Sequence, residues 1–233
     1  MKTMGMKTMG MKTIGMLWAC MLVTACAQDF PVVELNPDEQ KFEAELQATS
    51  DSDAQLTLAS MYVMHNKIDK ADSLLSNLVV EDGKNPQVLA WKAANDCKKA
   101  GRRGPWLMGL DKMWLVRECL ADLDNALAAA PDDFVVQMVH MSTASEVNMF
   151  DSLSRAATTR DRIDSFLQKQ PDAIPPDTNA QFQIVAAAIN RKQGQMDAAR
   201  ARLAVATPLA TTESTRSQLA HEQEQLARMS KSS

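Results

Sequence analysis

The chain has 233 residues, with 25 Lys and Arg against 29 Asp and Glu, and carries a formal net charge of -4 at pH 7. This length is enough for one domain that buries a single core without help from disulfides. The acidic balance argues against a nucleic-acid partner, because such partners are bound through a basic face that displaces counterions. The three histidines, His65, His140 and His221, lie far apart in sequence. We therefore expect no metal site and no cofactor.

The first 25 residues have the composition of an export signal. Lys2, Lys7 and Lys12 precede an uncharged, mostly apolar stretch from Thr13 to Ala25. A permanent membrane-spanning helix needs about 20 apolar residues, so this stretch is too short for one but suits the apolar core of a signal peptide. We expect residues 1–25 to be removed.

The leader ends in Leu22-Val23-Thr24-Ala25-Cys26, which resembles the bacterial lipobox: an aliphatic residue, two small residues and a cysteine. The alternatives are an ordinary signal peptide and a helix of an intracellular protein. The resemblance implies a lipoprotein with a diacylglycerol on the Cys26 thiol, cleavage before Cys26, and usually a further acyl chain such as palmitate on the new amino group. Two or three acyl chains hold a protein on a bilayer where one is marginal. Ala27 follows the cysteine. In enteric-type bacteria, the absence of Asp at that position implies the periplasmic face of the outer membrane.

Residues 26–51 are predicted to form a tether and a short helix. The segment from Cys26 to Leu35 shows no periodicity, which is typical of a tether. Asn36-Pro37-Asp38-Glu39 then supplies a cap residue, a proline at the first helical position and acid in the first turn. Phe42 and Leu46 form a narrow apolar stripe, and we expect this helix to end near Ala48.

Two amphipathic helices are predicted between Ser52 and Asp82. Their apolar stripes consist of Leu58, Ala59 and Tyr62, and, after a break near Asn66-Lys67, of Ala71, Leu75 and Leu78. Two such helices joined by a short turn pack antiparallel to bury both stripes. The spacing resembles the tetratricopeptide repeat, in which large, small and aromatic residues of the first helix accept a small and a large residue from the second. The resemblance places Ala71 at the close crossing of the pair.

A second match lies near the C-terminus, with Asn190 in place of the expected aromatic residue. Its residues are Ala186, Ala187, Gly194, Ala199, Leu203, Ala206 and Pro208, and the fainter matches between the two units are Leu123, Ala126, Ile163 and Phe166. Prolines at 86, 131, 171 and 208 separate the units. Thr212 to Arg228 predicts a last helix with Leu219, Gln223 and Leu226 facing inward. No segment alternates apolar and polar residues as a strand does. For residues 52–233 we expect an all-α, tetratricopeptide-like solenoid of about four antiparallel helix pairs plus a C-terminal capping helix.

Cys97 and Cys119 are the other cysteines of the mature chain, and an oxidising periplasm would allow them to pair. In a plain hairpin that turns at Gly101 to Gly104, Cys97 lies much closer to the turn than Cys119. The two thiols meet only if Pro105 to Asp111 forms a bend of its own. The alternatives are a disulfide and two buried thiols.

Lys98, Lys99, Arg102 and Arg103 form the one basic cluster of this acidic chain, and Trp106 follows them. A helix C-terminus favours cations, so one interpretation is a solvated helix end and loop. The other is an interaction surface for anionic lipid or an acidic partner, with Trp106 at the interface.

The sequence offers no catalytic constellation. It lacks a Gly-rich phosphate loop, a histidine pair at metal spacing and a nucleophile elbow, so we do not expect an enzyme. Met138, His140 and Met141 have the residue types of a soft copper site. Met138 and Met141 share a helical face while His140 points away, so core packing is the better interpretation.

The two resemblances together imply a binding module that works at the cell envelope. The first hypothesis is a membrane-tethered periplasmic scaffold or accessory lipoprotein that binds another envelope protein. The second is a periplasmic accessory that binds a small molecule or metal for a transporter, since Trp91, Trp106 and Trp114 could line a pocket.

Overall fold

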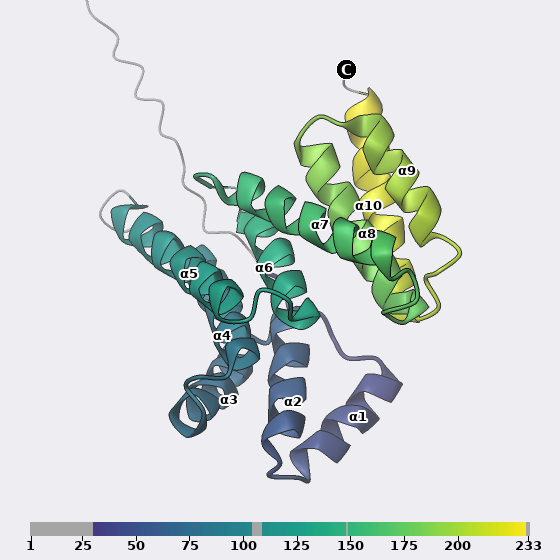
Figure 1. Cartoon of the computed structure of the whole chain (residues 1–233). Helices are drawn as coiled ribbons and strands as arrows, with labels where there is room; N and C mark the ends of the chain where they lie inside the picture. The colour runs from purple at the N-terminus through teal and green to yellow at the C-terminus, as the bar shows by residue number, and fades with distance from the viewer. Residues whose placement is uncertain (1–29, 104–108, 148, 232–233) are drawn as a thin grey trace, which may run out of the picture.

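The computed structural model describes residues 30–103, 109–147 and 149–231, which form ten α-helices and no strand. The prediction of an all-α protein is confirmed for this part of the chain. The leader, Cys26 and Trp106 lie outside the described residues. The helices, labelled in Figure 1, are α1 (Pro37–Gln47), α2 (Ser52–Met64), α3 (Ile68–Glu81), α4 (Pro86–Arg102), α5 (Leu110–Ala129), α6 (Phe134–Val147), α7 (Ser152–Lys169), α8 (Pro176–Lys192), α9 (Met196–Ala206) and α10 (Glu213–Lys231).

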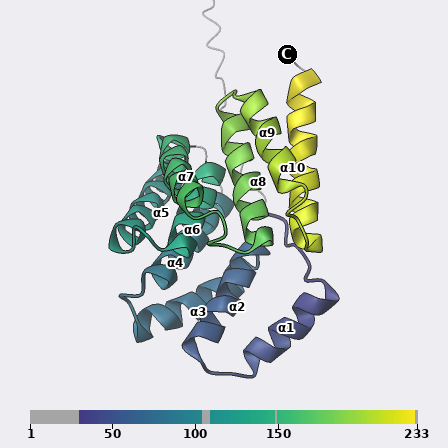
Figure 2. The ribbon, with the colours of Figure 1, turned by 45° about the vertical axis from the view of Figure 1, so that its right-hand side comes forward.

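Most of the helices pack as consecutive pairs: α2 with α3, α4 with α5, α6 with α7, and α8 with α9. The first helix of each pair also contacts the first helix of the next, and α8 contacts α10 in the same way. Figures 1 and 2 show α1 and α2 at one end of the molecule and α8, α9 and α10 towards the other. Pro131 and Pro171 lie at connections between pairs, and Pro208 lies between α9 and α10. Pro86 is the first residue of α4.

Fully buried alanines occupy the interior of the first and last pairs. Ala59 of α2 and Ala71 of α3 are 0% exposed, as are Ala187 of α8 and Ala199 of α9. A side chain that ends at Cβ lets two helix backbones come close, and interiors at this density leave no space for extra methylenes. The predicted burial of the helix stripes is therefore confirmed for these two pairs.

The turns of these two pairs are equivalent. The Lys67 backbone N–H donates to the Tyr62 carbonyl over 2.9 Å, and the Gln195 N–H donates to the Asn190 carbonyl over 2.8 Å. The residue before each donor is left-handed, with φ 57° at Asn66 and 78° at Gly194. This geometry is a Schellman cap, which is usually made by Gly and sometimes by Asn. Asn190 thus takes the place of Tyr62 without changing the backbone of the turn.

Helix α1 begins as predicted and belongs to the same packed body. The Asn36 side chain accepts from the Asp38 and Glu39 backbone N–H groups, and the Glu39 carboxylate accepts from the Asn36 N–H. The expected apolar stripe is only half correct, because Phe42 is 45% exposed while Leu46 packs against the core. Polar contacts complete the attachment: the hydroxyl of Tyr62 donates to Glu43 over 2.6 Å and accepts from Gln47 over 2.9 Å.

In α10 the inward positions differ from the prediction at one residue. Leu219 and Leu226 are buried as expected, but Gln223 is exposed. The neighbouring Glu222 is buried instead, and its carboxylate lies 2.6 Å from Nε of Arg191 in α8. A carboxylate can be buried here because the Arg191 guanidinium neutralises its charge and donates a hydrogen bond to each of its two oxygens.

Asp177, at the start of α8, fixes the connection between α9 and α10. Its carboxylate accepts from the backbone N–H groups of Thr211 and Thr212, and from the hydroxyl of Thr215 over 2.7 Å. Burial alone would raise the pKa of Asp177, but these donors outweigh it and lower the pKa to about 2.

The packing at Ala71 can be tested by Ala71→Leu, which adds bulk to a site with no exposed surface. Overpacking of a core typically costs about 1 to 3 kcal/mol, so we expect a lower melting temperature. Ala128→Leu is the control, because Ala128 is exposed on α5 and surface changes usually stay within about 0.5 kcal/mol. If the Ala71 variant melts with the parent protein, the helix crossing does not depend on this alanine.

The Asp177 contacts predict an acid-sensitive end of the molecule. Since the folded pKa of about 2 lies below the ordinary 3.8, the carboxylate contributes stability that is present above pH 3.8 and lost as the pH falls towards 2. Thermal melts at several pH values should show that Asp177→Asn is less stable than the parent at neutral pH and that the difference shrinks in acid. Asp172→Asn, at an exposed turn residue, is the matched control. A constant difference at all pH values would contradict this role.

Candidate functional site

The segment that leads from Cys26 into the fold is held against the α2–α3 turn. The Val33 N–H donates to the His65 carbonyl over 3.0 Å, and the Asn66 side chain donates to the Pro31 carbonyl over 2.9 Å. Leu35 is buried, at 4% exposure. The segment predicted to be a tether is therefore bonded to the packed helices from Pro31 onward.

Lys98, the first cation of the basic cluster, closes the end of α2. Its ammonium donates to the Val63 carbonyl and to the Asn66 side chain, both over 2.8 Å, and lies 6.0 Å from the ring centre of Phe30. Burial lowers the pKa of Lys98, and the nearby Glu146 partly opposes this. A cation at the carbonyl end of a helix is favourable, so Lys98 ties the N-terminal segment, α2 and α4 together.

The next two cations pair with acids of α3. These acids lie about 30 residues before the basic cluster, so the pairs are not evident from the sequence. Lys99 lies 2.8 Å from Asp72, and Arg102 forms a two-bonded pair with Asp69 at 2.6 and 3.2 Å. Arg103 is exposed at the end of α4. Lys98, Lys99 and Arg102 are thus engaged within the chain.

Cys97 and Cys119 form a disulfide that links α4 to α5, with their Cα atoms 5.4 Å apart. Of the two alternatives left by the sequence, the structure has the bonded one. Both residues are buried, at 6% and 2% exposure. Lys112, in the first turn of α5, donates to the Gly101 carbonyl over 3.2 Å, so the two helices are joined again close to where α4 ends.

The tryptophans do not share one environment. Trp91 packs against the core from α4, whereas Trp114 is 62% exposed on α5. Around Trp114 lie the exposed side chains of Leu110, Met113 and Arg117. Their spacing of three and four residues marks a shared helical face that could have been predicted from the sequence.

His140 forms a buried polar chain rather than a metal site. Its Nε2 lies 2.9 Å from Asp124 of α5, and its Nδ1 lies 3.0 Å from the hydroxyl of Thr159 of α7. A neutral ring with its proton on Nε2 satisfies both contacts. Burial lowers the pKa of His140, although Asp124 opposes this. These hydrogen bonds join α5, α6 and α7. His140 and Thr159 are only 3% and 2% exposed, so the Thr159 hydroxyl is not presented to solvent.

Met138 and Met141 face the core beside this chain, as the sequence suggests, with Met141 fully buried. Within the described residues no three His, Cys, Asp or Glu side chains are grouped to hold a metal ion. The same part of the chain contains no helix long and apolar enough to cross a bilayer.

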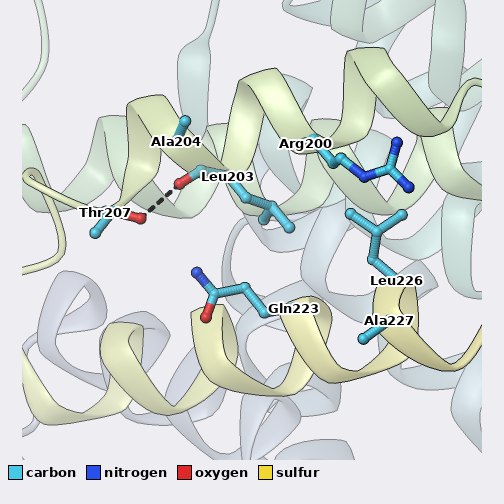
Figure 3. Close-up of a pocket in the computed structure, with 7 residues that line it drawn as sticks. All are labelled: Arg200, Leu203, Ala204, Thr207, Gln223, Leu226 and Ala227. Atoms are coloured by element: carbon cyan, nitrogen blue, oxygen red, sulfur yellow. Dashed lines mark hydrogen bonds between the residues drawn. The ribbon is translucent and has the colours of Figure 1, made fainter. Parts of the chain in front are cut away.

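Two surface hollows lie between helices. One, of about 380 Å³, lies between α9 and α10 (Figure 3), where Leu203, Gln223 and Leu226 face one another and the Thr207 hydroxyl donates to the Leu203 carbonyl over 2.7 Å. The other, of about 400 Å³, is lined by α3, α4 and α5 with Ser76, Val79, Leu89, Lys92, Ala93, Asp96, Asp122 and Asn125. Neither hollow is lined by a tryptophan.

Comparison with known proteins adds no relative: no family model, no curated protein and no solved structure matches this chain. The roles given above follow from the contacts of the residues themselves.

The disulfide predicts a strong response to reduction. Closing a loop across 22 residues contributes about 3 kcal/mol by the chain-entropy estimate. We expect a reducing agent to lower the melting temperature of the parent protein. The double variant Cys97→Ala, Cys119→Ala should melt near the reduced parent and should not respond to reductant. A parent protein that melts identically with and without reductant would show that the bond adds no stability.

Proposed function

We propose that this chain is an exported lipoprotein, held by lipid on Cys26 at the periplasmic face of the outer membrane, whose helix pairs form a tetratricopeptide-like module that binds another envelope protein. The lipid is the membrane partner, and the protein acts as a scaffold or accessory subunit without a cofactor or catalytic site of its own.

The observation that carries the binding module is the equivalence of the first and last helix pairs. Their turns have the same cap geometry, with Asn66 and Gly194 at the left-handed position. The Ala71 N–H donates to the Lys67 carbonyl as the Ala199 N–H donates to the Gln195 carbonyl, both over 3.0 Å. Repetition of one helix pair along a chain is how repeat modules build an extended binding surface.

The position of the N-terminal segment supports the tether. Pro31 and Val33 are bonded to the α2–α3 turn, so a lipid on Cys26 would hold the packed helices close to the bilayer. Since two or three acyl chains suffice for stable attachment, no membrane-spanning helix is needed.

The exposed surface available to a partner lies mainly on the second helices of the pairs. Helices α4, α6 and α8 are largely buried between their neighbours, whereas α3 and α7 carry exposed apolar side chains. These include Val80 and Phe166. We therefore place the contact with an envelope protein on this outer surface.

The second candidate, an accessory that binds a small molecule or metal for a transporter, depended on a tryptophan-lined pocket. Trp91 lies against the core and Trp114 is exposed, and neither lines the hollow between α9 and α10 or the one beside α3, α4 and α5. The observations therefore favour the protein-binding module.

Cys26→Ser tests the anchor. In the bacterium that encodes the protein, intact-mass measurement should show the parent cut before Cys26 with acyl chains attached, and the variant uncut and without lipid, because the thiol is the acceptor. A variant that is still processed and stays bound to membranes would contradict the proposal that the protein is a lipoprotein.

Capture of crosslinked complexes from intact cells tests the binding module. We expect the parent to yield one envelope protein in fixed ratio, and Phe166→Asp on α7 to reduce that yield if the outer surface makes the contact. Lys169→Asp, on the last turn of the same helix, serves as the control for charge alone. Equal yields from the parent and the Phe166 variant would contradict this placement.

A further inference from the structure

Helix α5 begins with an exposed apolar face. Leu110, Met113 and Trp114 are 60%, 41% and 62% exposed, and Arg117 follows one turn later on the same side. Positions spaced by three and four residues share one face of a helix. We propose that this face, together with Phe150, rests in the headgroup region of the bilayer to which Cys26 is attached, as a second membrane contact. The proposal rests on the lipid anchor proposed above.

Phe150 extends the face across the α6–α7 turn. Its side chain is 51% exposed, and the Arg117 guanidinium lies 5.6 Å from its ring centre. The backbone of Phe150 is left-handed, with φ 56°, a conformation that is unfavourable for a bulky residue. Strained residues of this kind persist where the surrounding structure fixes them and often mark a functional contact.

The face lies at the end of α4 to which the anchor leads. Lys112, between Leu110 and Met113, is bonded to the Gly101 carbonyl, and one turn earlier in α4 Lys98 lies beside Phe30. Only three residues separate Phe30 from Cys26. Fully extended, that connection spans about 14 Å, so the lipid holds this end of the molecule within that distance of the bilayer.

The residue types fit a lipid headgroup region. Trp is enriched at the boundary between hydrocarbon and water, where its ring is apolar and its N–H can meet a polar group. Arg117 and the exposed Arg103 suit anionic headgroups, and Glu118 at the next position ends the apolar face. A single flexible tether leaves the orientation of a protein free, whereas a second contact on the same end fixes it.

Quenching of tryptophan fluorescence by lipids brominated near the headgroup tests the contact. The protein purified from membranes is reconstituted into vesicles of phosphatidylethanolamine and phosphatidylglycerol. We expect the parent to be quenched and Trp114→Phe to lose roughly half of that quenching or more, since Phe keeps the apolar contact but removes the reporter. Trp91→Phe is the control, because Trp91 packs against the core, and it should keep the quenching.

A second pair of variants tests whether the quenching depends on the apolar face of α5 or on any exposed apolar residue. Leu110→Asp should reduce the quenching of Trp114, whereas Val80→Asp, at an 87% exposed residue near the C-terminal end of α3, should not. Circular dichroism melts should show that both variants fold, since both side chains are exposed. Equal quenching of the parent and Trp114→Phe, or no quenching in vesicles, would overturn the proposal.

The mass of the same sample distinguishes this proposal from the anchor. Lipid on Cys26 without quenching at Trp114 overturns the second contact and leaves the anchor. Quenching at Trp114 in a protein without lipid overturns the anchor and supports the face as a membrane contact by itself. A protein that shows neither lipid on Cys26 nor quenching at Trp114 overturns both proposals.

Discussion

The fold depends on close contact between helices whose facing side chains end at Cβ. Ala59, Ala71, Ala187 and Ala199 have no exposed surface, and each lies one to two turns from the cap that reverses the chain. Small residues at these positions let the two helices approach and bury the larger side chains beside them. The larger buried side chains are mostly aliphatic, such as Leu75, Leu123 and Ile189, in keeping with a chain that is 45% hydrophobic but only 5% aromatic.

The end of α4 is where several constraints meet. Its last turns hold the disulfide to α5, the Lys98 contact to α2, and the ion pairs of Lys99 and Arg102 with α3. Cations that appear as a surface cluster in sequence are here the means by which three helices and the N-terminal segment are joined. Exposed ion pairs such as Arg102 with Asp69 contribute little stability, so the disulfide and the buried part of Lys98 carry more of the connection.

This arrangement links the proposed anchor to the rest of the molecule. A lipid on Cys26 would act on Pro31 and Val33, which are bonded to the α2–α3 turn, and through Lys98 on α4. Forces on the tether would therefore reach the packed helices within a few residues. The outer surfaces of α3 and α7 would then be held at a fixed height above the bilayer, where a protein of the envelope could bind them.

Several helix boundaries could be predicted from the sequence, because they carry a local signal. Asn36 and Pro37 start α1, Asn66 and Gly194 end helices in left-handed caps, and the prolines separate the pairs. The spacing of Ala71 and Leu75 also predicted which side of α3 is buried. These features depend on residues within a few positions of one another, so one sequence is enough to read them.

Which polar groups meet depends on the tertiary structure. Lys99 of α4 pairs with Asp72 of α3, and His140 of α6 lies between Asp124 of α5 and Thr159 of α7. In α10 it is Glu222, rather than the expected Gln223, that faces inward, where it pairs with Arg191 of α8. Such contacts depend on how helices cross and rotate, which local periodicity does not specify. The same reason applies to Trp114: its helix was predictable, but its exposure follows from which face of α5 the disulfide and the neighbouring helices cover.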